Sequence, residues 1–306
     1  MADPLTELRT ACAEVARRAR HVAIEYQSIG PYAASLPLES EPGPPEPRLH
    51  GTREELAAFW LVLDAINFGS GWFPTLRKRP GRSGYFTIAG GVHDRFYAYG
   101  PWRAEELATI SAREVAAVLG QDPDHELMGL FARSLQDLGV HVAGGYNGRF
   151  ADVVNSAGAC AVTLVATLAR WRCFEDTSEF EGIAVPFLKR AQIASADLAL
   201  AGVARFGDLE RLTIFADNLV PHVLRLDGVL RFEPSLVERI ESGELLEHGS
   251  AEEVEIRACA VHAVELIVRQ RGSGVSAAGL DRLLWHRGQQ PRYKSRPRHR
   301  SRCTAY

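Results

Sequence analysis

The sequence predicts a mainly α-helical fold, a compact helical domain over residues 1–306 that includes a small β-hairpin element. Three observations predict this class. Apolar residues recur at helical spacing in most of the chain, several of these stretches begin with a helix N-cap pattern, and no repeat of fixed period is present, which argues against a solenoid. With 46% hydrophobic and 24% charged residues, the chain has the composition of a globular protein with a sizeable core.

N-cap patterns place most of the predicted helices. Asp3 followed by Pro4 begins the first one, because aspartate caps the amides of a first turn in which proline is tolerated. A Ser or Thr followed three residues later by Glu forms a capping box, in which each side chain bonds the other residue's backbone amide. By these signals, the sequence predicts helices after the caps Thr52, Ser111, Ser250 and Ser276. Further helices are predicted from 122 to about 142, over 153–171 as one long apolar helix, and from Pro186 onward.

Four stretches are predicted to be irregular or β. Residues 27–50 are rich in Pro, Gly and Ser and are expected to form a long loop, which in a compact domain is often functional. Residues 67–72 form a Gly-rich turn, and the aromatic, β-branched residues 85–99 with their central Gly-Gly are expected to form the hairpin. The basic tail 289–306 is expected to fold back or to extend into solvent rather than to bind nucleic acid.

Charge and composition favour a cytoplasmic protein and do not favour one that binds nucleic acid. A net charge of −3 gives no overall field that attracts nucleic acid. No apolar run approaches the roughly 20 residues that span a bilayer, and the N-terminus lacks a signal-peptide core. The five cysteines are odd in number and not closely spaced, so free thiols are expected, and neither they nor the ten histidines form a metal-binding pattern.

An acidic residue ends the apolar segment 211–217, with Asp217 two positions after Phe215. A carboxylate at the edge of the core beside an aromatic ring suits glycosidic cleavage, because it can stabilise an oxocarbenium-like transition state and orient or deprotonate the attacking water. The alternative is structural: Asp217 caps a helix whose first turn contains Pro221. From the residues alone, the structural role is favoured.

Lys189 and Arg190 lie in the first turns of the helix predicted from Pro186. Two cations in this position oppose the helix dipole unless an anion is bound. The pattern indicates a phosphate site, built from Lys189 or Arg190 with helix amides, or else a solvated basic face or an ion pair with Glu181. Further along the chain, a glutamate at 253 and an arginine at 257 are spaced to form a structural ion pair.

Two further groups of residues are candidates for a base-binding pocket. Asp281 and Trp285 share one face of the last helix, although the residues alone favour a surface aspartate beside a core tryptophan. His50 stands at the end of the predicted loop and is of interest if that loop closes over a pocket with Asn67 and Trp72.

Seven short motifs along the chain resemble one known family in their order and spacing, the queuosine salvage proteins, which are queuosine 5′-phosphate N-glycosylase/hydrolases. The resemblance covers nearly the whole chain and is weak between about 73 and 177. The motifs are I-N-F ending at Phe68, F-E-G…K-R-A-Q-I over 180–193, L-T-I-F-A-D over 212–217, G-E-L-L-x-x-G over 243–249, E-V-E-I-R over 253–257, L-D-x-x-L-W over 280–285 and R-x-R-C-x-x-Y over 300–306.

The resemblance implies a helical fold similar to that of DNA glycosylases and hydrolysis of queuosine 5′-phosphate to queuine and ribose 5-phosphate without a cofactor. It implies a catalytic carboxylate at Asp217, a base-stacking aromatic at Phe215, a pocket residue at His50 and a base-recognising carboxylate at Asp281. In two places the chain departs from eukaryotic members. Their F-A-D-Y-R is F-A-D-N-L here, and their L-W-D ends in His286.

The chemistry of this implied substrate accounts for the residue types. Queuine is a 7-deazaguanine, so the leaving base cannot be activated by protonating a ring nitrogen at that position, and the enzyme depends more on stabilising the ribosyl cation. Its cationic amine and its diol favour a carboxylate such as Asp281. Phe215 and Trp72 would sandwich the flat base, while Lys189 and Arg190 would select the phosphorylated substrate.

Two other functions stay open at this point. One is a nucleic-acid-binding or DNA-repair protein that uses a glycosylase-like fold and the basic tail. The other is a non-catalytic queuine carrier. The expected partners are the substrate queuosine 5′-phosphate and the product queuine, with no membrane and no stable nucleic-acid partner, while the oligomeric state is not indicated.

Overall fold

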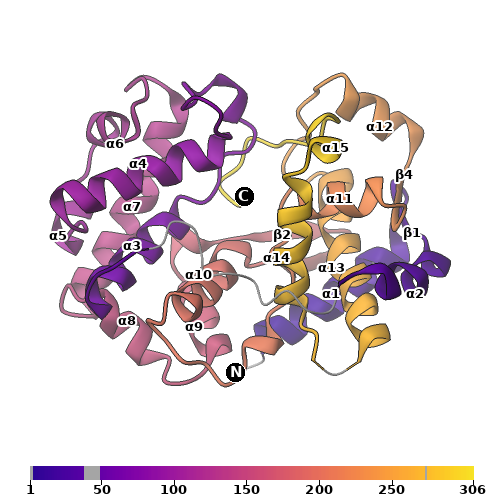
Figure 1. Cartoon of the computed structure of the whole chain (residues 1–306), viewed down its shortest axis with the longest axis horizontal. Helices are drawn as coiled ribbons and strands as arrows, with labels where there is room; N and C mark the ends of the chain where they lie inside the picture. Colours follow the sequence, from indigo (N-terminus) through magenta and orange to yellow (C-terminus); the bar gives the residue numbers. More distant parts are fainter. Residues whose placement is uncertain (1–2, 38–48, 273) are drawn as a thin grey trace. The chain divides into compact units, whose positions relative to one another are not determined.

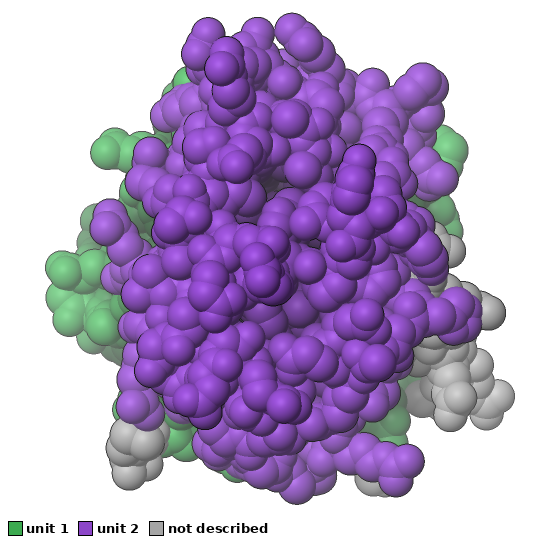
Figure 2. Space-filling model, turned by 90° about the vertical axis from the view of Figure 1, so that its left-hand side faces the viewer, with its two compact units in different colours: residues 1–43, 176–189, 208–302 green, residues 44–175, 190–207, 303–306 purple. Residues whose placement is uncertain are grey.

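The computed structural model describes residues 3–37, 49–272 and 274–306. It is mainly helical, and its strands form two small antiparallel sheets (Figure 1). The chain divides into two compact units, coloured separately in Figure 2. Unit 1 comprises Met1–Gly43, Asp176–Lys189 and Asp208–Arg302, and unit 2 comprises Pro44–Glu175, Arg190–Gly207 and Cys303–Tyr306. Within the described ranges, no helix is both long enough and apolar enough to cross a membrane.

Unit 1 combines helices with all of the assigned strands. Its two sheets pair β1 with β4 and β2 with β3, both antiparallel, and the β2–β3 pair is a hairpin in which Phe180 faces Ile183. Its elements are α1 (Pro4–Arg18), β1 (Val22–Ile24), α2 (Tyr26–Ser35), β2 (Thr177–Phe180), β3 (Ile183–Pro186), η3 (Leu209–Arg211), α11 (Val220–Leu226), β4 (Leu230–Phe232), α12 (Pro234–Glu241), α13 (Ala251–Arg271), α14 (Ala277–Gly288) and α15 (Pro291–Lys294).

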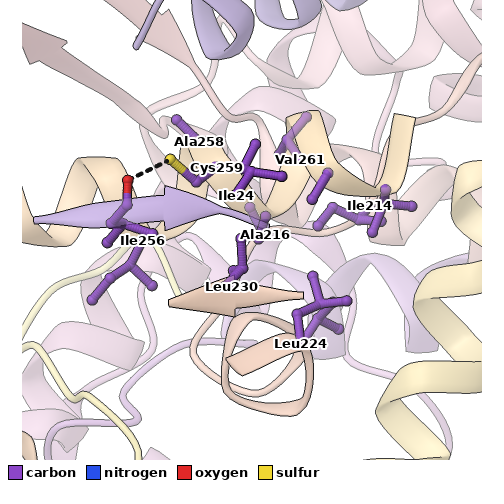
Figure 3. Close-up of a cluster of buried hydrophobic side chains, with 14 of the residues drawn as sticks. Ile24, Ile214, Ala216, Leu224, Leu230, Ile256, Ala258, Cys259 and Val261 are labelled. Atoms are coloured by element: carbon purple, nitrogen blue, oxygen red, sulfur yellow. Dashed lines mark hydrogen bonds between the residues drawn. The ribbon is translucent and has the colours of Figure 1, made fainter. Parts of the chain in front are cut away.

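Helix α13 forms the centre of the core of unit 1. It packs against α1, α2 and β1. Figure 3 shows Ile256, Ala258 and Val261 of α13 in one apolar cluster with Ile24 of β1 and Leu230 of β4. Each fully buried aliphatic side chain in such a cluster contributes about 1.5–3 kcal/mol relative to an exposed one, so the segments that reach this cluster are firmly held.

A buried carboxylate on α13 also fixes the start of β1. Glu255 Oε2 accepts hydrogen bonds from the amides of Arg20 (3.0 Å), His21 (2.6 Å) and Val22 (3.0 Å). Three amide donors compensate the cost of burying this charge. The Glu255 carboxylate therefore has a structural role, which is to hold the chain at the start of β1.

Unit 2 is a helical bundle around α7 (Glu126–Gly145), which packs against α3, α5 and α6. Helix α10 (Lys189–Leu200) begins at the last residue of a unit 1 segment and continues in unit 2. The other elements are α3 (Arg53–Ala65), η1 (Phe73–Thr75), α4 (Gly84–Tyr99), α5 (Ala104–Leu107), α6 (Ala112–Leu119), α8 (Phe150–Ser156), α9 (Ala161–Leu168) and η2 (Arg172–Phe174).

The predicted N-caps are confirmed. Asp3 caps α1, and both members of the capping boxes at Thr52 and Ser111 are in place. Ser250 accepts a hydrogen bond at the start of α13, and Ser276 does the same at the start of α14. These signals succeed because a cap involves residues only a few positions apart.

The hairpin predicted at 85–99 is wrong, because these residues form α4, capped by Ser83. The Gly-Gly pair that suggested a turn lies inside this helix. A Cβ at Gly91 would meet Leu119 and the carbonyl oxygen of Val118 at 2.8–3.1 Å, so the glycine allows α4 and α6 to approach each other closely. A hairpin does occur, but it is formed by β2 and β3.

Other predicted boundaries also need correction. The loop expected over 27–50 contains α2 as far as Ser35, and 38–48 lie outside the described residues. The single helix expected over 153–171 is two helices, α8 and α9, separated near Gly158, whose φ is +60°. The helix predicted from Pro186 begins at Lys189, because Pro186 ends β3, and the helix predicted from 122 begins at Glu126.

The basic tail is folded, one of the two outcomes expected for it. In unit 1, Tyr293, His299 and Ser301 are buried. In unit 2, the tail residues Cys303, Ala305 and Tyr306 form a small buried cluster, and the carbonyl of Tyr306 accepts a hydrogen bond from Gly69 N at 3.0 Å.

Candidate active site

The segment before Asp217 alternates between the core and the surface of unit 1. Ile214 and Ala216 are buried in the cluster of Figure 3, whereas Phe215 and Asp217 are half-buried. In an extended chain, successive side chains point to opposite sides. The burial of Ile214 and Ala216 therefore directs Phe215 and Asp217 to the border of the core.

The Asp217 carboxylate is held by the start of α11. Its Oδ1 atom accepts hydrogen bonds from Leu219 N (2.7 Å) and Val220 N (3.2 Å). Within the described part of the chain, no protein group is hydrogen-bonded to its Oδ2 atom. Arg298 is close enough for the Asp217 charge to act on it: burial lowers the pKa of Arg298, and Asp217 partly offsets this.

The structural alternative for Asp217 is met only in part. Its Oδ1 atom accepts from two amides at the start of α11, whose first turn contains Pro221, but the N-cap position of this helix is Leu219 and no side chain caps it. The second oxygen keeps its lone pairs for other partners. The two hydrogen bonds to Oδ1 fix the orientation of the group, which is a property that a catalytic carboxylate also needs.

Asp281 lies directly beside this segment. Its side chain is buried, and its Oδ1 atom accepts a hydrogen bond from Phe215 N at 2.8 Å. It belongs to α14, which also carries the half-buried Trp285 one turn later. The structure therefore brings Phe215, Asp217 and Asp281 together in unit 1, and Asp281 is not the surface residue that its pattern alone favoured.

Lys189 also belongs to unit 1, at the first position of α10. Its side chain is buried, and its amide donates to Asp176 Oδ2 at 2.9 Å. The preceding Leu188 has a φ of +54°, a left-handed conformation that is costly for a branched residue and that turns the chain sharply from β3 into α10. Surrounding contacts therefore hold this turn.

Arg190 has a different environment in unit 2. Its guanidinium donates to the carbonyls of Ala65 (2.8 Å) and Glu175 (3.3 Å) and to that of Cys173. It also lies 5.1 Å from the ring centre of Phe68. These contacts describe an arginine that stabilises its own unit, and phosphate binding by Arg190 stays a prediction that they do not support.

The remaining candidates in unit 2 lie in three different environments. Asn67 lines a small apolar pocket with Phe68, Phe73 and Tyr85. Trp72 is buried, and its indole N–H donates to Glu126 Oε2 at 2.7 Å. His50 is exposed. Substrate contacts by His50, Asn67 and Trp72 stay predictions.

Sequence reasoning missed Asp176, which is buried beside the turn that leads to Lys189. Its carboxylate forms a two-oxygen ion pair with Arg257, whose predicted partner Glu253 lies 3.5 Å away. The predicted Glu253–Arg257 ion pair is thus confirmed, but Asp176 lies 81 positions from Arg257 and no local spacing marks it. Among the residues that the structure describes, no three His, Cys, Asp or Glu side chains form a possible metal site.

Comparison with known proteins gives matches over the full length. Residues 47–306 match the family model described as queuosine salvage protein. The chain is 35% identical over 331 residues to a Sphaerobacter thermophilus protein named queuosine 5′-phosphate N-glycosylase/hydrolase, with all of both chains covered. Proteins of the same name from Mus musculus and Bos taurus are 28% and 29% identical, with 100% and 99% of this chain and all of each relative covered. The chain therefore belongs to the queuosine salvage protein family.

Proposed function

We propose that this protein hydrolyses the N-glycosidic bond of queuosine 5′-phosphate and releases queuine. The observation that carries this function is the full-length similarity to relatives that are named for this activity. The geometry of unit 1 supports it, because Asp217 is an oriented carboxylate in which one oxygen accepts no hydrogen bond from the described residues. The fold is proposed to resemble that of DNA glycosylases.

Asp217 is the proposed catalytic group. As the bond to the base breaks, positive charge develops on the ribose, and a fixed anion beside it stabilises this transition state. The Oδ1 atom is occupied by two backbone amides. The Oδ2 atom is therefore the one proposed to face the ribose or to orient the attacking water.

Unit 1 also supplies the proposed contacts to the rest of the substrate. Phe215 stacks on the flat base, with Trp285 nearby on α14, and Asp281 recognises its polar groups. Because Asp281 Oδ1 also accepts from Phe215 N, the two base contacts are fixed relative to each other. Lys189 is the proposed cation for the 5′-phosphate.

The test is Asp217→Asn. The side-chain oxygen of asparagine can accept the same two hydrogen bonds from Leu219 N and Val220 N, so the variant keeps the start of α11 while losing the negative charge. We expect kcat for queuine release from queuosine 5′-phosphate to fall by about 10³-fold or more. The urea midpoint should stay close to that of the unchanged protein. Chromatography of the released base measures the rate.

A matched control is Ser111→Ala, which removes an N-cap from α6 in unit 2. It should lose about 1 kcal/mol of stability and retain full activity. An Asp217→Asn protein that releases queuine at the unchanged rate would rule out the catalytic role of this carboxylate. No release by the unchanged protein would rule out the proposed reaction.

A further inference from the structure

We propose that Arg257 and Asp176 form a positioning pair that fixes the two segments of unit 1 that carry Asp217 and Lys189. The inference rests on the proposed function, since it assigns the pair a role in aligning groups that act on one substrate. Neither residue is proposed to touch the substrate.

The Arg257 guanidinium binds the main chain directly before Asp217. Its Nε atom donates to the carbonyl of Ala216 at 2.9 Å. Its Nη1 atom lies 3.5 Å from Glu253 Oε1, and the group lies 3.9 Å from the ring centre of Phe187. The planar guanidinium is therefore held by contacts in its plane and on its face, and its contact to Ala216 has little freedom to shift.

Asp176 connects this guanidinium to the second segment. Both of its carboxylate oxygens accept from Arg257 Nη2, at 2.9 and 2.8 Å. Its Oδ2 atom also accepts from Lys189 N at 2.9 Å, and its carbonyl accepts from Leu188 N at 3.2 Å. One pair of side chains thus joins the carbonyl preceding Asp217 to the amide of Lys189.

Stability alone does not account for a pair of this kind. Both side chains are completely buried, so their desolvation offsets much of their attraction. Well-packed apolar residues often replace such a pair without loss of stability. What apolar residues cannot reproduce is a set of directed hydrogen bonds to two separate stretches of main chain, one at each functional segment.

Helix α13 offers a matched control. Glu255 is as buried as Arg257 and lies two positions away, but its carboxylate binds the amides of residues 20–22. Glu255→Gln therefore disturbs a buried charge on the same helix without changing the contacts of Ala216 or Lys189. Its loss of stability shows how much activity a general weakening of unit 1 removes.

The two ends of the pair predict different kinetic effects. In Arg257→Lys, one ammonium group cannot bind both Ala216 and the two oxygens of Asp176. The Asp217 segment should shift, and kcat for queuosine 5′-phosphate should fall about 10²-fold, as small misplacements of a catalytic group do. Asp176→Asn weakens the end at Lys189, and the KM for queuosine 5′-phosphate should rise about tenfold with a smaller change in kcat. Glu255→Gln should change neither constant more than about twofold.

A double variant keeps the proposal testable if single changes prevent folding. Arg257→Met combined with Asp176→Leu leaves no unpaired buried charge, and its folding is checked by circular dichroism and a urea titration. We expect a folded protein whose kcat/KM is at least 10²-fold lower. A folded double variant with unchanged kcat and KM overturns the proposal, as does a loss in Glu255→Gln equal to that in Arg257→Lys. An unchanged protein without turnover overturns the proposed function and this proposal with it.

Discussion

At the scale of single residues, the two carboxylate oxygens of Asp217 have different surroundings. The Oδ1 atom of Asp217 accepts from two amides at the start of α11, and the Oδ2 atom is the one proposed to act on the substrate. A side chain that is already held by backbone amides loses less conformational freedom when a substrate binds, because its orientation is already set. The structural and the catalytic interpretations of Asp217 are therefore compatible.

Arg190 provides a residue-scale prediction about stability. Arg190→Met keeps much of the aliphatic stem but leaves the carbonyls of Ala65, Cys173 and Glu175 without this donor. We expect the free energy of unfolding to fall by about 3 kcal/mol, because buried polar groups lose hydrogen bonds. A urea titration followed by circular dichroism measures it.

Arg205→Met is the control for that change, since Arg205 is exposed in the same unit. Its effect should stay within about 0.5 kcal/mol. Equal stability of the Arg190 and Arg205 variants would show that the contacts of the Arg190 guanidinium contribute little.

At the scale of helices, the packing of α5 on α7 depends on one missing side chain. A Cβ at Gly139 would lie 2.4 Å from Ala108 N and 2.6 Å from the carbonyl oxygen of Ala104, both backbone atoms that cannot move alone. Gly139→Ala should therefore destabilise the protein by about 2 kcal/mol, although alanine favours helix formation. Thermal unfolding measures the difference.

Gly144, on the same helix, is the control position for this substitution. A Cβ there has no neighbour within 4 Å, so Gly144→Ala should be neutral or stabilising by up to about 1 kcal/mol. If Gly139→Ala stabilised the protein as Gly144→Ala does, the close approach of α5 and α7 would be wrong.

The sequence predicts the features of a helix that depend on neighbouring residues and misses those that depend on distant ones. N-caps such as Ser111 were found because the residues that form them are close in sequence. The Gly-Gly at 90 and 91 does not form a turn, because Gly91 allows a close approach to α6, a partner that local sequence does not reveal. In the site, Asp217 and Asp281 could be chosen from short motifs, but the contact of Asp281 with Phe215 N joins residues 66 positions apart. Asp176 was missed for the same reason.

For the molecule as a whole, two buried histidines predict acid sensitivity. Burial lowers the pKa of His222 to about 4 and that of His299 to about 3, with nearby arginines adding to the effect. In the unfolded chain both titrate near 6.5. Below this pH the unfolded state binds protons that the folded state does not. The contribution of the two neutral rings to the free energy of unfolding is therefore fully present above pH 6.5 and is lost as the pH falls toward 4.

Each histidine should contribute a slope of about 1.4 kcal/mol per pH unit between roughly pH 6 and pH 5. Urea titrations across this range measure the slope. His299→Gln should reduce the slope by the contribution of one proton, about 1.4 kcal/mol per pH unit. A flat stability profile between pH 7 and pH 5 would contradict the neutral state of both rings.

The interleaving of the two units has a consequence for synthesis. Unit 2 has a long continuous stretch, 44–175, whereas unit 1 draws on residues from both ends of the chain up to Arg302. On a ribosome, α1 emerges before α13, its main packing partner, because all the residues between Arg18 and Ala251 are made in the meantime. The apolar face of α1 therefore stays without this packing partner until α13 has been made.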